Sequence, residues 1–152
     1  RADHGVASDV GAHHPARAGA APFVLHASSS ADRAELTLSL LHQRWHEWSS
    51  QPLSEADLTL ARAKLRGQVA HGRQTCSQRA ERAAHRRGLG LSDDHDQRCL
   101  ERMKSLQPQQ LMEAAQRWLH TPHLSLCGPA DALKRLEDHW RQLQSSAATG
   151  SS

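Results

Sequence analysis

The chain has 152 residues, enough for one domain of ordinary size with its own hydrophobic core. Its 19 Lys and Arg exceed its 16 Asp and Glu by a formal charge of only +3, too small a bias for a strong nucleic-acid binder. No apolar run approaches the ~20 residues of a membrane-spanning helix, and the three cysteines form no C-x-x-C pair. We therefore expect a cytoplasmic protein without a membrane partner.

Alternating apolar residues predict two β-strands early in the chain, over residues 5–12 and 22–28. The residues that alternate are Val6, Val10, Phe23, Leu25 and Ala27. Pro15 and Gly19 stand between the two segments, as is typical of an exposed hairpin connection.

A helical period follows, and its i, i+4, i+7 spacing predicts a helix over residues 31–48. Ser54 predicts the N-cap of a second helix, which could extend over residues 55–87. Gly67 and Gly72 each weaken that helix by roughly 1 kcal/mol relative to Ala, so we expect a bend near them.

Three more helices are predicted after Ser92, from Pro108 and after Pro129, with a third strand over residues 123–127. Strands, several helices, a strand and a helix indicate an α+β fold. We expect a two-layer sandwich, with helices packed on one face of a mostly antiparallel sheet.

The ordered domain is expected to cover residues 1–143, and a disordered tail residues 144–152, because the tail has no apolar anchor. The chain opens on Arg1 without an initiator Met, so we expect a domain that is incomplete at its N-terminus.

Segments spread over most of the chain, at residues 1–8, 19, 23–25, 45–48, 53–64, 106–119 and 124–129, resemble the zinc-free C-terminal half of insulinase/pitrilysin (inverzincin) metallopeptidases. Residues 1–8 (RADHGVAS) resemble the R-x-x-x-G-x-A-Y segment of that half, and residues 53–64 resemble its T-x-x-E-L-x-x-A-K helix start. Residues 106–119 resemble its closing helix, and residues 124–129 (LSLCGP) its strand ending in a Gly turn. The resemblance covers nearly the whole chain through order and spacing.

This resemblance implies two similar α+β halves that close around an extended peptide, with zinc bound by an H-x-x-E-H motif in the first half only. No H-x-x-E-H occurs in this sequence. The resemblance therefore implies a non-catalytic chamber wall with no catalytic or metal-binding residue of its own. The expected partners are a zinc-bearing N-terminal half, which holds the cofactor, and an extended or unfolded peptide.

Two substrate-binding residues follow from the resemblance. Arg1 stands at the position of the family's Arg that contacts the substrate near the scissile bond. Ser8 stands where the family usually has a Tyr that stabilises the developing oxyanion, and its hydroxyl is much shorter. Arg1 is thus the better supported substrate contact.

His42 and His46 form an i, i+4 pair that could share a Zn²⁺, although Gln43 and Trp45 stand where a zinc-peptidase motif needs Glu. We favour a solvated helix face for this pair.

The alternative function is a protein-interaction module, or a nucleic-acid binder that uses a basic run on the second helix. The stripe in question is formed by Arg79, Arg82 and Arg86. We favour a solvated or interdomain role for it, because no aromatic stacking platform accompanies it.

All three cysteines fall on or near apolar stripes, and we expect them to be small core residues. They are Cys76, Cys99 and Cys127.

Overall fold

Two β-strands and six α-helices make up the part of the chain that the computed structural model describes, residues 5–149. The strands are β1 (Asp9–His13) and β2 (Val24–Ser28). The helices are α1 (Ala34–Ser50), α2 (Glu55–His71), α3 (Cys76–Gly88), α4 (His95–Ser105), α5 (Pro108–Trp118) and α6 (Ala130–Thr149). The α+β class is therefore confirmed at this level.

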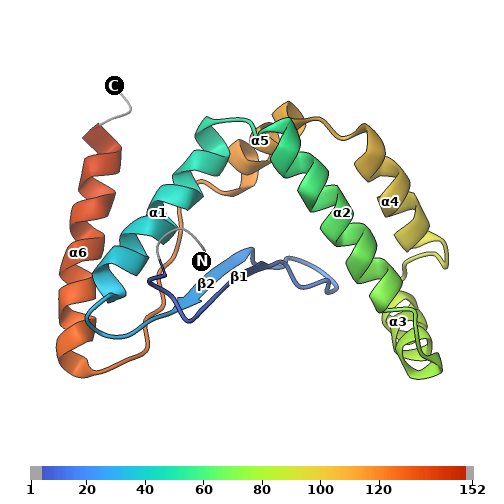
Figure 1. Cartoon of the computed structure of the whole chain (residues 1–152), viewed down its shortest axis with the longest axis horizontal. Helices are drawn as coiled ribbons and strands as arrows, with labels where there is room; N and C mark the ends of the chain where they lie inside the picture. Colours follow the sequence, from blue (N-terminus) through green and yellow to red (C-terminus); the bar gives the residue numbers. More distant parts are fainter. Residues whose placement is uncertain (1–4, 150–152) are drawn as a thin grey trace.

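The helices are arranged as two limbs of an arch (Figure 1). One limb, called here the apolar limb, consists of the hairpin, α1, α5 and α6, and α1 contacts β2, α5 and α6. The other, called here the charged limb, consists of α2, α3 and α4, with α2 in contact with α4. The chain passes between the limbs near the top of the arch, after α1 and again before α5 (Figure 1).

β1 and β2 form an antiparallel hairpin whose register confirms the predicted apolar face. Val10 lies opposite Ala27 and Ala12 opposite Leu25, so these side chains share one face. On the other face the ring of His26 covers Gly11, and a Cβ at Gly11 would lie 2.7 Å from its Cε1 atom. Only glycine leaves room for the ring in this position.

The predicted third strand over residues 123–127 is wrong. Leu124 and Leu126 are half-buried and their neighbours exposed, as the alternation predicts, but the segment pairs with no strand among residues 5–149. Alternation decides which side chains are buried, whereas a ladder also needs the edge of a neighbouring strand. The sheet of the described region has two strands.

The long helix predicted over residues 55–87 is two helices. Ser54 begins α2 as predicted, and its side chain accepts a hydrogen bond from the backbone N–H of Asp57. Gly72 ends α2, and Thr75 starts α3 with a reciprocal capping box. The expected bend near the glycines is therefore a complete break, and the charged limb turns there.

The core is small and divided between the limbs. The buried apolar residues are Leu38, Leu58, Val69, Ala115, Ala132 and Leu136. α3 contributes no buried residue. The last helix, α6, continues to Thr149, beyond residue 143 where we expected the ordered domain to end.

Candidate functional site

Ser8, one of the two predicted substrate-binding residues, lies exposed where the chain enters the hairpin. Its hydroxyl donates a hydrogen bond of 3.2 Å to the carbonyl of Ser28, and its backbone N–H donates to the same oxygen at 2.8 Å. The hydroxyl would have to leave this acceptor before it could donate to a substrate. Arg1, the other predicted residue, lies outside the described residues.

Each strand of the hairpin has only one neighbour in the described region, so each keeps one edge unpaired. Val10 is 38% exposed on the apolar face. On the opposite face Asp9 Oδ2 lies 3.4 Å from His26 Nε2, and the His26 ring lies 5.8 Å from that of His13. The hairpin therefore offers free backbone edges and a polar, histidine-bearing face.

His42 and His46 lie half-buried toward α6 and not on the solvated face that we favoured. Their Nε2 atoms are 3.1 Å apart, and the His42 ring packs edge-on against Trp140 of α6. Ser39 Oγ lies 2.6 Å from His139 Nε2, which joins the same two helices. Partial burial, and then the nearby His46 and His139, lower the pKa of His42. The neutral form of His42 is thereby favoured between α1 and α6.

No group of three or more His, Cys, Asp or Glu side chains within residues 5–149 is placed to hold a metal ion. The cysteines are free, and the core prediction is wrong for two of them: Cys76 and Cys127 are exposed, whereas Cys99 is half-buried. Cys76 is the first residue of α3, and Cys127 lies in the loop before α6. At these positions the apolar period of a helix does not determine whether a side chain is buried.

Asp96 gathers three arginines from the break between α2 and α3 and from α3 itself. Its Oδ2 accepts from Arg82 Nε at 2.6 Å, from Arg86 Nη1 at 2.9 Å and from Arg73 Nη2 at 3.2 Å. The bond from Arg82 lowers the pKa of Asp96 far below its usual range; burial opposes this, and Arg73 and Arg86 add to it. This cluster holds α3 against the first turn of α4.

The predicted basic stripe is therefore largely engaged within the protein. Arg82 and Arg86 bind Asp96, and the side chain of Arg86 is only 16% exposed. Arg79 donates to the sulfur of Cys76. The role of Asp96 was missed in the sequence because it stands in the first turn of a helix, where an acid has a local explanation.

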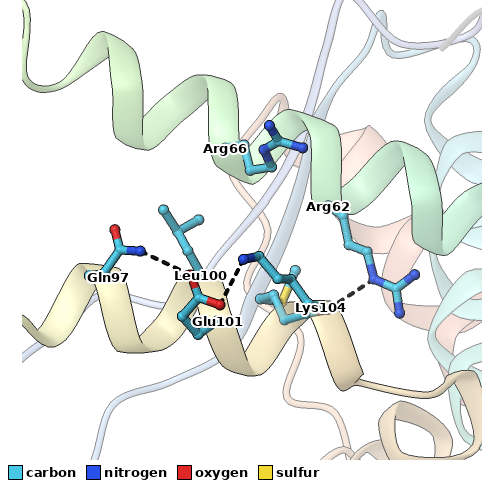
Figure 2. A pocket seen from close by; sticks show the side chains of 7 residues that line it. Arg62, Arg66, Gln97, Leu100, Glu101 and Lys104 are labelled. Carbon is cyan, nitrogen blue, oxygen red and sulfur yellow. Dashed lines mark hydrogen bonds and ion pairs between the residues drawn. The ribbon is translucent and has the colours of Figure 1, made fainter.

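A groove lies between α2 and α4. Two adjoining pockets, of about 280 and 470 Å³, share Arg66 and Leu100 as lining residues. Figure 2 shows Arg62 and Arg66 on α2 and Leu100 and Lys104 on α4, the two helices that border the groove. Arg62 and Arg66 belong to the basic run predicted on the second helix, but their position opposite α4 is not visible in the sequence, because α3 separates the two helices in the chain.

Arg62 crosses the end of this groove to cap α4. Its Nε donates to the carbonyl of Met103 at 2.9 Å and its Nη2 to the carbonyl of Leu106 at 2.5 Å. These bonds satisfy carbonyls that lack a partner at a helix C-terminus, where a cation is also favoured by the helix dipole. The guanidinium thereby fixes the spacing of α2 and α4 without meeting a carboxylate.

We find no helix within residues 5–149 that combines the length and apolar character needed to cross a membrane. Comparison of the chain with protein-family models, curated proteins and solved structures finds no match in any of the three. The assignment to the insulinase/pitrilysin family therefore stays a prediction that rests on the segments quoted above.

Proposed function

We propose that this chain is a non-catalytic domain of an insulinase/pitrilysin-type zinc metallopeptidase. In this proposal it forms the chamber wall that holds an extended peptide opposite a zinc-bearing half. The observation that supports the proposal is the hairpin of β1 and β2, whose outer edges have no partner within residues 5–149. Unpaired strand edges are the surfaces to which extended peptides add by main-chain hydrogen bonds.

The proposal also implies that the hairpin is part of a larger sheet in the complete peptidase. A hairpin alone is marginally stable in water, and a sheet of three or more strands is the usual stable unit. Residues 123–127 belong to no helix or strand, alternate in burial and have no ladder partner among the described residues. In the proposed two-layer sandwich, strands from other parts of the peptidase complete the sheet, and the helices of the apolar limb cover one face.

Ser8 and Arg1 are the proposed substrate contacts, as the resemblance implies. The Ser8 hydroxyl is exposed at the start of the hairpin and donates to Ser28 of the neighbouring strand, on the paired side of β1. Because it already donates to Ser28, we assign it to positioning of the β1 edge, and Arg1 to direct contact with a peptide carbonyl.

Strand addition is tested with a fluorescein-labelled, unstructured 15-residue peptide rich in Val and Thr, by fluorescence anisotropy. A second peptide of the same sequence, N-methylated at alternate residues, keeps the side chains but loses the donors on one edge. We expect the methylated peptide to bind at least ten-fold more weakly, because the main chain carries the affinity in this binding mode.

Equal binding of the two peptides, or binding of neither, would contradict the proposal. The same peptide incubated with the chain and Zn²⁺ should stay intact in mass spectra. Chelator-sensitive cleavage by the chain alone would show that the catalytic machinery lies within it.

A further inference from the structure

The groove between α2 and α4 lies on the charged limb, has no hairpin residue in its lining, and has an apolar floor between basic rims. Val69 and Leu100 lie at its floor, with Met103 at one end. The rims carry Arg62, Arg66, Arg73 and Lys104 against a single lining carboxylate, Glu101.

Two of these charges are not neutralised within the described residues. Glu101 is paired with Lys104 at 2.7 Å, and Arg73 with Asp96 at 3.2 Å. Arg62 binds only backbone carbonyls, and exposed Arg66 makes no hydrogen bond or ion pair with any described residue. The groove thus presents two uncompensated guanidinium groups beside an apolar surface (Figure 2).

From these observations we propose that the groove between α2 and α4 binds an acidic, amphipathic helix of a partner protein. The apolar face of that helix would cover Leu100 and Val69, and its flanking carboxylates would pair with Arg62 and Arg66. A helix that lays its apolar face between two others is an established mode of peptide recognition. This site is separate from the hairpin and does not depend on the proposed peptidase role.

The length of the groove and its lining residues determine which kind of partner it can bind. The basic rim begins at Arg62 on α2 and continues to Arg73 just beyond its end; the helical part, from Arg62 to His71, is about 14 Å long at 1.5 Å per residue, or about two and a half helical turns of an occupant. No aromatic side chain lines either pocket, so nucleic-acid bases have no surface on which to stack. An apolar floor with arginine rims matches a helix with leucines on one face and glutamates beside them.

The test uses a fluorescein-labelled, 14-residue helical peptide with Leu on one face and Glu on both flanks, measured by fluorescence anisotropy at low salt. Arg66→Glu should weaken binding at least ten-fold, because an attraction becomes a repulsion. Lys64→Glu is the matched control: it makes the same charge change on α2 but lies outside the groove lining, and should change affinity less than two-fold. A peptide with Gln in place of Glu should bind at least ten-fold more weakly to the unchanged protein.

Gly67→Leu tests the groove without removing a charge. A Cβ at Gly67 meets no atom within 4 Å, and the position lines the groove, so the new side chain enters it without a backbone clash. Leu is also a better helix former than Gly. We expect peptide binding to be lost while the Tm does not fall.

Three results would overturn the proposal. Arg66→Glu and Lys64→Glu could weaken binding equally, which would mean that only overall charge matters. Gly67→Leu could leave binding intact, which would place the peptide elsewhere. A 14-nucleotide single strand, or a second copy of this chain detected by light scattering, could depend on Arg66 and Gly67 while the acidic peptide fails to bind.

Discussion

The two limbs of the arch are held together by different physical means. In the apolar limb the ring of Phe23 packs 6.1 Å from Trp45 and 5.8 Å from Trp48, and Leu38 of α1 is buried. In the charged limb α2 buries Leu58 and Val69, but α3 has no buried residue and its arginines converge on Asp96. Asp, Glu, Lys and Arg make up 23% of the chain. Ion pairs therefore hold α3, the helix without a buried apolar residue.

Because they are stabilised by different interactions, the two limbs should open under different conditions. Burial of apolar and aromatic surface depends little on salt and on the charge of carboxylates. A carboxylate held by guanidinium groups loses its interactions once it is protonated. The apolar limb should therefore respond mainly to loss of side-chain volume, and the charged limb to protonation of its carboxylates.

The largest effect is expected from Leu38→Ala in the apolar limb. Leu38 is 5% exposed on α1, and truncating a buried Leu costs about 3 kcal/mol through lost burial and the cavity left behind. Urea unfolding followed by tryptophan fluorescence measures it, since Trp45 and Trp48 lie on the same helix.

Leu36→Ala is the matched control, because Leu36 belongs to the same helix but is 51% exposed. We expect it to cost less than about 0.5 kcal/mol, the usual range for surface positions. Equal losses for the two variants would mean that α1 is not held by burial of this face.

The second effect is local and belongs to the charged limb. Asp96→Ala leaves three guanidinium groups facing one another, and we expect α3 to lose about 2 kcal/mol of protection, the scale of hydrogen bonds to a charged group. Hydrogen exchange of the α3 amides reports this loss directly. The amides of α1 should be unchanged, because Asp96 does not reach the apolar limb.

The pH dependence of that protection has a definite sign. The folded pKa of Asp96 lies below its unfolded value, so its contribution is complete above about pH 4 and is lost as the pH falls below it. Asp93→Ala is the control, since the Asp93–Arg87 pair is 3.6 Å apart with both side chains over 70% exposed. If Asp93→Ala opened α3 as much as Asp96→Ala, the cluster would not be what holds it.

Features that depend on neighbouring residues could be predicted from the sequence, whereas features that need a distant partner could not. Helix starts were predictable where a local signal exists, as at Ser54, whose side chain caps α2. Gly67 and Gly72 drew attention to a bend, but the capping box at Thr75 turned it into a break. The strand at residues 123–127 failed because its pattern is local while its partner must come from elsewhere.

The candidate sites depend on contacts between distant residues, which a sequence does not display. Asp96 meets Arg82 across 14 residues, and Arg62 reaches the carbonyl of Leu106 across 44. The excess of arginines on α3 was visible, but not the single carboxylate that receives them. The functional reading of Ser8 came from resemblance alone, and its bond to Ser28 became apparent only in the structure.

The smallest expected effect belongs to the apolar limb, which also responds to acid but at a higher pH than the Asp96 cluster. His42 is packed against Trp140 and lies near His46 and His139, and its pKa is lowered in the folded state. The unfolded chain, with an imidazole pKa of about 6.5, therefore binds more protons, and stability falls as the pH drops below that value. We expect the Tm difference between pH 7.5 and pH 5.0 to shrink in His42→Phe, which keeps a ring against Trp140.

His71→Phe is the control, because His71 is exposed on α2 and makes no hydrogen bond or ring contact with a described residue. It should leave the Tm difference unchanged. An unchanged difference in His42→Phe as well would mean that the acid response arises from other histidines. If only His42→Phe reduces the Tm difference, the apolar limb loosens between pH 7.5 and 5.0 while the Asp96 cluster is still intact. The two limbs then open one after the other as the pH falls.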